Sequence, residues 1–280
     1  FKEEVIPNHS NKWLFVLGPC LAMLTAMMTS AIIPWGGTVE IGGRMIDLQI
    51  ADINIGILYV FGVVSMGVYG IMIGGWASNN KFSLMAALRG ASQAISYELA
   101  MGLSLIALLM LTGSLSLKTI VEQQISGNWW NIVYQPLGFF IFFVCALAEC
   151  NRAPFDLPEA ESELNMGYHQ EYSSMKLGFF LFAEYINMFI SCAIIATLFF
   201  GGYEMPFVDE TKLSGVTAWL TGVAALFGKT FILIFVFMWI RWTLPRFRYD
   251  QLMNLGWKGL IPLALLNMVA TAAIALYTMK

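Results

Sequence analysis

Three glutamates interrupt stretches of the sequence that are otherwise apolar. Glu98 lies in AISYELAMGL, Glu149 closes FFVCALAE, and Glu184 divides FFLFAEYINMF. A charged side chain near the centre of a bilayer costs about 2.5–3.5 kcal/mol, and such residues usually face a cavity or a partner. Burial and neighbouring acids can hold a carboxyl group near the point where it takes up and releases protons. These residues therefore indicate a proton relay, with buried acids that only stabilise helix packing as the alternative; Arg152 could pair with Glu149 or with an acid that follows it.

The segment after Glu149 carries a local excess of acids. Six acidic residues stand against two basic ones, namely Glu149, Asp156, Glu159, Glu161, Glu163 and Glu171 against Arg152 and Lys176. Pro154 and Pro158 disfavour helix in the residues before them, so we expect a loop over 150–176. An isolated acidic run is usually a solvated surface. Because this loop joins two acid-bearing apolar stretches, its glutamates at i, i+2 and i+4 would instead titrate as a coupled set.

Basic residues gather where a later apolar stretch ends. Arg241, Arg246 and Arg248 lie in RWTLPRFRYDQ, and Pro245 ends the helix. Anchoring at the membrane surface is the plainest role for such arginines. An irregular segment after the proline could also present guanidinium groups to a cavity or to a docked soluble protein. Lys229, in FGKTFILIF, is either a membrane-surface anchor or a relay base.

The composition places these residues in a membrane protein. The 280 residues are 58% hydrophobic and 12% charged, whereas a soluble domain carries about 25% charged residues. A helix needs about 20 mostly apolar residues to cross a bilayer. Seven segments approach this length, namely 13–34, 53–76, 92–113, 133–149, 177–200, 226–243 and 259–278. The sequence thus predicts an all-α, polytopic transmembrane helical bundle of seven spans, forming a single membrane domain over 1–280.

Lysines and arginines are divided unequally between the two sides of this predicted bundle. Ten fall on one side and five on the other: Lys2, Lys12, Lys81, Arg89, Arg152, Lys176, Arg241, Arg246, Arg248 and Lys258 against Arg44, Lys118, Lys212, Lys229 and Lys280. Basic residues are retained in the cytoplasm, which places the N-terminus and the 150–176 loop inside. A net charge of −3 without a basic run does not favour nucleic acid as a partner. Cys20, Cys145, Cys150 and Cys192 form no metal-binding pattern, which predicts buried thiols.

Four blocks of the sequence match the pattern of a known family. They are ADINIGILYVFGVVSMGVYGIMIGGWASNNKFSLMAALRGASQAISYELAMGL (51–103), AECNRAPFDLPEAESELNMGYHQEYSSMK (148–176), FAEY (182–185) and RWTLPRFRYDQLMNLGWK (241–258). These blocks resemble the H subunit of the proton-pumping NADH:quinone oxidoreductase, respiratory complex I, which corresponds to mitochondrial NADH dehydrogenase subunit 1. The second block is highly specific, and together the blocks cover somewhat over a third of the chain.

The resemblance implies a membrane subunit beside the peripheral arm, whose helices help form a quinone tunnel. It implies proton-relay roles for Glu98, Glu149, Glu159, Glu161, Glu163 and Glu184. It implies quinone-tunnel or interface roles for Arg152, Phe155, Asp156, Arg241, Arg246 and Arg248. Quinone is then a substrate, and the partners are the lipid bilayer and the other complex I subunits of both arms. FMN and iron–sulfur clusters are expected on those subunits, with no metal or redox centre on this chain.

The family pattern also leads to expectations about the whole protein. Its members begin with a further span, so we expect eight spans in the intact chain and a bacterial inner-membrane location, with an organellar inner membrane as the alternative. An energy-converting hydrogenase or ferredoxin-linked relative shares the AExxRxPFD core, but ESELNMGYHQEYSSMK and PRFRYDQLM favour the quinone-reducing branch. A secondary transporter would show paired interrupted helices, and no such pairing is visible. A passive membrane anchor is the third alternative.

Glu161→Gln tests the relay role implied for the acidic loop. The substitution removes a titratable carboxyl group at nearly constant volume, so it should lower quinone-dependent turnover while leaving assembly intact. Both are measured on membranes that contain the variant. Normal turnover together with normal proton pumping would exclude a relay role for Glu161.

Overall fold

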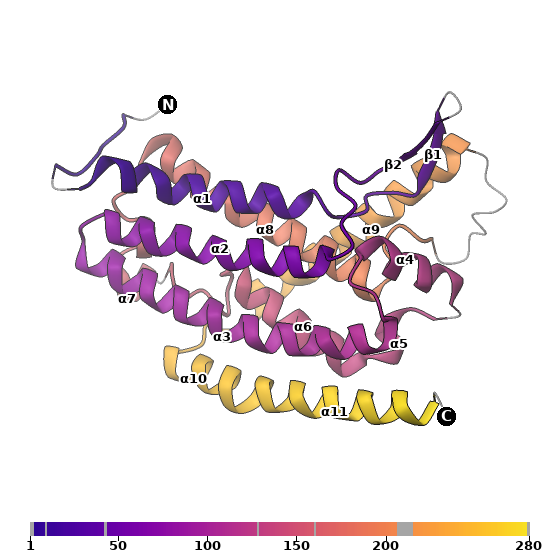
Figure 1. The fold of residues 1–280 in the computed structure, drawn as a ribbon. Coiled ribbons are helices and arrows are strands. Elements are labelled where there is room, and N and C mark those ends of the chain that lie inside the picture. The colour runs from indigo at the N-terminus through magenta and orange to yellow at the C-terminus, as the bar shows by residue number, and fades with distance from the viewer. Residues whose placement is uncertain are drawn as a thin grey trace.

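The computed structural model describes residues 3–8, 10–41, 44–127, 129–159, 161–205 and 215–278. Its long helices lie side by side, parallel or antiparallel to one another, as Figure 1 shows. The elements are, in chain order, α1 (Lys12–Ser30), β1 (Thr38–Ile41), β2 (Arg44–Asp47), α2 (Gly56–Ala77), α3 (Lys81–Thr112), α4 (Leu117–Ser126), α5 (Asn131–Tyr134), α6 (Pro136–Glu149), α7 (Glu161–Leu164), η1 (Gly167–His169), α8 (Ser174–Phe199), α9 (Gly215–Thr243), α10 (Tyr249–Asn254), the π-helical turn η3 (Leu255–Leu260) and α11 (Ile261–Thr278). The all-α, polytopic fold predicted from the sequence is confirmed.

The fourth predicted span differs from the others in length. Within the described residues, six helices are long and apolar enough to cross a membrane: Lys12–Ser30, Gly56–Ala77, Lys81–Thr112, Ser174–Phe199, Trp219–Thr243 and Tyr249–Tyr277. The segment predicted over 133–149 contains α6, which has 14 residues. At about 1.5 Å per residue, α6 extends about 21 Å, less than the ~30 Å core of a bilayer. Gln135 breaks the helix before it, with φ −132° and ψ 59°.

Two further features were not expected from the hydropathy. Helix α3 begins at Lys81 rather than near residue 92, and the Asn80 side chain caps it by accepting a hydrogen bond from the Phe82 N–H at 3.0 Å. Hydropathy detects only the apolar part of such a helix, because Lys81, Arg89 and Gln93 lower the mean hydropathy of its first turns. Strands β1 and β2 form an antiparallel hairpin in which Val39 pairs with Ile46.

Helices α1 and α2 approach each other through glycines. A Cβ atom at Gly18 would lie 2.9 Å from the Gly74 Cα, and one at Gly70 would lie 2.9 Å from the Ala22 backbone nitrogen. Small residues allow helix backbones in a membrane to come this close. The α1–α2 contact therefore depends on the absence of side chains at these positions.

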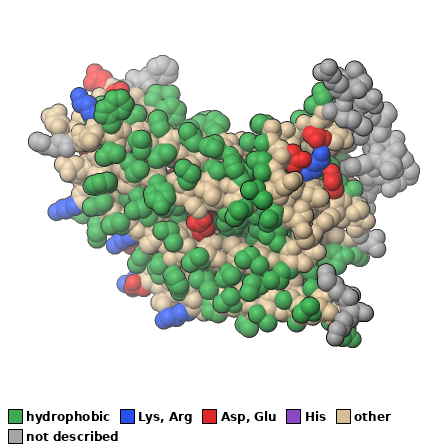
Figure 2. Space-filling view, in the orientation of Figure 1, with side chains coloured by type: hydrophobic (Ala, Val, Ile, Leu, Met, Phe, Trp, Pro, Cys, Tyr) green, Lys and Arg blue, Asp and Glu red, His purple; other side chains and the backbone are tan. Residues whose placement is uncertain are grey.

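The bundle has two distinct ends. The loop end carries the segments 150–173 and 244–248, and the hairpin end carries β1, β2 and α4 (Figure 1). Hydrophobic side chains cover most of the face in Figure 2, while charged side chains lie mainly toward the two ends. This arrangement agrees with an apolar band that faces lipid or neighbouring subunits. Both Lys12 and Lys81, which start α1 and α3, lie at the loop end.

A matched pair of glycine substitutions in α2 tests the close α1–α2 contact. Gly70→Val should destabilise the protein by about 1–3 kcal/mol, the usual cost of overpacking, because the new side chain would strike the α1 backbone. Gly62→Val is the control on the same helix, since a Cβ at Gly62 would meet no atom within 4 Å. Thermal unfolding in detergent measures both, and equal melting temperatures would contradict the packing argument.

Candidate functional site

Glu184 is a buried acid held between a phenol and a guanidinium group. It lies in α8 and is 7% exposed. The Tyr168 hydroxyl donates a hydrogen bond to Glu184 Oε1 at 3.0 Å, and Arg152 Nη2 lies 3.6 Å from Glu184 Oε2. Arg152 also lies over the Tyr185 ring, 4.4 Å from its centroid. The structure thus pairs Arg152 with Glu184, rather than with Glu149 or a loop acid as the sequence suggested, because the first turns of α8 pack against the segment that follows α6.

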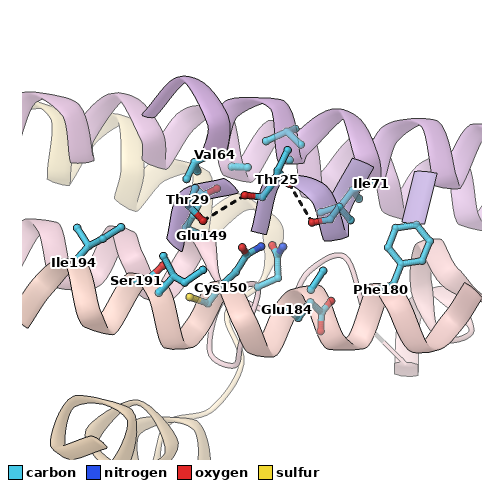
Figure 3. A pocket seen from close by; sticks show the side chains of 18 of the residues that line it. Thr25, Thr29, Val64, Ile71, Glu149, Cys150, Phe180, Glu184, Ser191 and Ile194 are labelled. Atoms are coloured by element: carbon cyan, nitrogen blue, oxygen red, sulfur yellow. Dashed lines mark hydrogen bonds between the residues drawn. The ribbon is translucent and has the colours of Figure 1, made fainter. Parts of the chain in front are cut away.

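A cavity inside the bundle connects two of the predicted acids. Glu149 and Glu184 both line it, together with Thr25 and Thr29 of α1 and Ser191 of α8 (Figure 3). The cavity leaves about 60 Å³ for the centres of water molecules, and about 10–15 Å³ is enough for one water. Several waters therefore fit between these carboxyl groups. The Glu149 Oε2 atom is buried and has no hydrogen-bond partner within the described residues, so a water there would satisfy it.

Glu98 is a third predicted acid, and it interacts with Glu149. A second cavity of about 40 Å³ adjoins Glu149 and is walled by apolar residues that include Phe61 and Met101. Glu98 lies on α3, where it accepts a hydrogen bond from the Ser65 hydroxyl of α2. Its carboxyl group is close enough to Glu149 for the two to interact electrostatically. The three acids therefore form a series in which Glu98 is linked to Glu149 electrostatically and Glu149 to Glu184 by the cavity that both line.

The segment after α6 is bound to the segment after α9. Arg246 Nη2 lies 2.6 Å from Asp156 Oδ2, the Phe247 N–H donates to the Pro154 carbonyl oxygen at 3.2 Å, and the Phe155 and Phe247 rings pack with centroids 5.7 Å apart. Burial and the neighbouring Glu159 raise the pKa of Asp156 to about 6, against the opposing effect of Arg246. Asp156 is thus an acid that titrates close to the physiological range.

The structure gives different partners to Glu159 and Glu163, two acids of the set predicted to titrate together. Glu159 lies next to Glu184 and interacts with its carboxyl group, and its Oε1 atom is buried without a hydrogen-bond partner in the described part of the chain. Glu163 lies at the surface, where it forms an ion pair with Arg89 at 2.9 Å. The side chain of Glu161, which begins α7, lies outside the described residues. The proton-relay roles of these acids remain predictions.

Comparison with known proteins identifies the family. The model of the NADH dehydrogenase family matches residues 1–272. An H subunit of the NADH-quinone oxidoreductase of Cytophaga hutchinsonii is 64% identical over 272 residues, which cover 97% of this chain and 79% of the relative. The H subunit of Flavobacterium johnsoniae is 62% identical, with 98% and 79% covered, and an H subunit of Geobacter sulfurreducens is 48% identical, with 98% and 78% covered.

The chain belongs to the family of NADH-quinone oxidoreductase H subunits. The family predicted from the sequence blocks is thereby confirmed. The block over 148–176, which carries much of the resemblance, also lines the Glu149–Glu184 cavity through Cys150, Asn151 and Tyr168.

Arg241, Arg248 and Lys229 are the other basic residues considered from the sequence, and their surroundings differ from those of Arg152 and Arg246. Arg241 is half-buried in the last turn of α9, and Arg248 is exposed at the start of α10; neither forms an ion pair with another described residue. Lys229 donates hydrogen bonds to the backbone carbonyl oxygens of Phe200, Gly202 and Glu204 at the hairpin end. This geometry favours a structural role for Lys229 over a relay base.

The prediction that all four thiols are buried was wrong for one of them. Cys145, Cys150 and Cys192 are buried as predicted, but Cys20 is exposed because it lies on the outward side of α1.

Two polar residues of the site were not predicted from the sequence. Tyr168 was missed, since no local pattern relates it to Glu184, 16 positions along the chain. Gln93 was missed as well; it is fully buried in α3 and donates to the Ala148 and Phe155 carbonyl oxygens at 2.9 and 2.7 Å.

The pKa of Asp156 predicts how the Arg246 ion pair depends on pH. Arg246→Gln should destabilise the protein by about 1 kcal/mol at about pH 8, where Asp156 is ionised, and by much less at about pH 5, where it is protonated and gains little from a cation. Thermal unfolding at the two pH values measures this difference. Arg246→Lys keeps the charge and should retain most of the stability. Equal destabilisation by Arg246→Gln at both pH values would contradict the assignment.

Proposed function

We propose that this chain is the membrane subunit of an NADH:quinone oxidoreductase that helps form the quinone-binding tunnel and couples quinone reduction to proton translocation. Quinone is the substrate, and the FMN and iron–sulfur clusters belong to partner subunits. The partners are the subunits of the peripheral arm, at the loop end, and the neighbouring membrane subunits, along the apolar faces. The location is the inner membrane of a bacterium, which agrees with the bacterial sources of the similar subunits.

The observation that carries this proposal is a series of acids, two of which line one cavity with room for several waters. Glu149 and Glu184 share that cavity, and Glu98 interacts electrostatically with Glu149. Glu159 acts in the same way on Glu184. Between Glu149 and Glu184 the cavity leaves room for waters, through which a proton can move. A change of charge at one end of the series can therefore be passed along it as a change of protonation.

The loop end supplies the place where quinone chemistry would act on this series. Reduction of a quinone to a quinol takes up two electrons, supplied by the partner subunits, and two protons. Nearby groups that give up these protons each become one unit more negative. Asp156, on the segment implied to face the quinone headgroup, forms an ion pair with Arg246. Arg152, in the same segment, acts electrostatically on Asp156 and lies 3.6 Å from Glu184. In the proposed mechanism, a change at Asp156 alters the field at Arg152, and the Arg152–Glu184 pair passes this change to the cavity.

Purification of the intact assembly tests the function as a whole. The chain is tagged, extracted gently, and tested for copurifying subunits and for NADH:quinone and hydrogen-evolving activities. A large assembly with FMN and iron–sulfur absorbance and NADH:quinone activity supports the proposal. Hydrogen evolution with a nickel-containing partner would place the chain in a hydrogenase, and a lone chain without redox partners would contradict both.

Glu184→Gln tests the coupling role within that assembly. The amide keeps the size of the side chain and removes the titratable group, so proton translocation per NADH oxidised should fall severalfold while the assembly survives. The control is Glu122→Gln, an exposed acid on α4 at the hairpin end, which should behave as the parent. Full translocation in Glu184→Gln would show that the buried acid is a packing feature, as a passive anchor requires.

A further inference from the structure

We propose that Tyr168 is a positioning residue for Glu184, through which the conformation of the turn at Met166 and Gly167 controls the orientation of the Glu184 carboxyl group. The inference rests on the proposed function, because it assigns a further residue to the same relay. It concerns the hydroxyl of Tyr168 and not its bulk.

Tyr168 is the direct hydrogen-bond donor to Glu184 among the described residues. The phenol is 1% exposed, and its hydroxyl lies 3.0 Å from Glu184 Oε1. The other carboxyl oxygen, Oε2, is 3.6 Å from Arg152 Nη2 and has no hydrogen-bond partner in the described part of the chain. The hydrogen bond from Tyr168 therefore gives a directional restraint at Oε1, while Arg152 and Glu159 act on the carboxyl group through their charge and proximity.

The phenol keeps its proton over the working pH range. Burial, followed by the nearby carboxyl groups of Glu184 and Glu159, raises the pKa of Tyr168 well above its ordinary value. The hydroxyl consequently stays a donor whichever protonation state Glu184 adopts. This property suits a group that orients an acid without exchanging protons with the solvent.

The backbone before Tyr168 forms a turn that places the phenol beside Glu184. Met166 and Gly167 have φ values of 73° and 79°, in the left-handed region. A Cβ atom at Gly167 would lie 2.0 Å from the Pro158 carbonyl oxygen, and the Tyr168 N–H donates to that same oxygen at 3.3 Å. A bulky residue such as Met166 is rarely found at positive φ, so the surroundings must hold the turn in place.

This turn links the acidic loop to the cavity. Glu159, adjacent to Pro158, interacts with Glu184, and the Tyr168 ring packs on Phe180 of α8 with centroids 5.2 Å apart. Tyr168 also lines the cavity that contains Glu149 and Glu184. Any displacement of the turn would move the hydroxyl away from Oε1 and release the carboxyl group to rotate toward Arg152 or toward the cavity. The hydrogen bond therefore makes the orientation of Glu184 depend on the loop.

Tyr168→Phe in the assembled complex tests the proposal, with Tyr172→Phe as the matched control. Tyr172 is also buried and packs on Phe180, but its hydroxyl donates to the Gly74 backbone carbonyl oxygen at 3.2 Å. Tyr168→Phe should lower proton translocation per NADH about two- to tenfold, as expected for the loss of one buried hydrogen bond. Tyr172→Phe should change it by less than about twofold. Both values are normalised to the amount of assembled complex.

Infrared difference spectroscopy between the oxidised and reduced complex measures the frequency of the Glu184 carboxyl band, which a purely structural role of Tyr168 would leave unchanged. The carboxyl band of Glu184 is the one that Glu184→Gln removes. It should shift in Tyr168→Phe, because a hydrogen bond to a carboxyl oxygen changes its stretching frequency, and it should keep its position in Tyr172→Phe. An unshifted band in Tyr168→Phe, or an equal loss of translocation in both tyrosine variants, would overturn the proposal.

Two further variants keep the test decisive. If Tyr168→Phe reduces assembly, replacement of Tyr168 by 3-fluorotyrosine keeps the ring and the hydroxyl but strengthens the donor, and the band should still shift. In a Glu184→Gln background, Tyr168→Phe should cause no further loss of translocation. Full translocation in Glu184→Gln alone would contradict the proposed function, whereas an unshifted band contradicts only the role of Tyr168.

Discussion

The contact between Glu184 and Arg152 places the strongest constraint on the loop end, because both side chains are withdrawn from water. Each is 7% exposed, and their charged atoms are 3.6 Å apart, beyond ordinary hydrogen-bond length. Removing one partner of a buried pair leaves an uncompensated charge, which costs about 3–5 kcal/mol. The surrounding structure must therefore supply further partners: the Tyr168 hydroxyl on one side and the Tyr185 ring on the other.

The same segment is held on its other side by contacts that do not involve Glu184. Gln93 donates to the carbonyl oxygens of Ala148 and Phe155, which fixes the end of α6 relative to the loop. Arg246 and Phe247 bind the loop from the α9–α10 connection. An electrostatic change at Asp156 is thus applied to a segment that is fixed by α3 and α9, while its far end carries the donor to Glu184. A loop held at both ends can transmit a small displacement where a free loop would absorb it.

The sequence predicted the membrane helices and the acids well, because both depend on local composition. The burial of Glu184 follows from an acid in an apolar stretch, and Pro245 correctly marks the end of the α9 region, which stops at Thr243. Contacts between distant segments could not be found in this way. The pairing of Arg152 with Glu184 rather than Glu149 depends on how α8 packs after the loop. The ion pair of Glu163 joins it to Arg89, 74 residues earlier in the chain.

The surroundings of Lys229 and of Arg152 differ in whether the groups that hold the cation can titrate. Lys229 donates hydrogen bonds to backbone carbonyl oxygens after α8, where φ is positive at Gly201 and Gly202. Carbonyl oxygens do not titrate in the physiological range, so these bonds hold the chain in every protonation state. Arg152 instead faces carboxyl groups whose charge can change. The bonds of Lys229 to carbonyl dipoles stabilise the hairpin end, whereas the contact of Arg152 with Glu184 at the loop end responds to protons, and a contact of this second kind can pass a change of charge into the membrane.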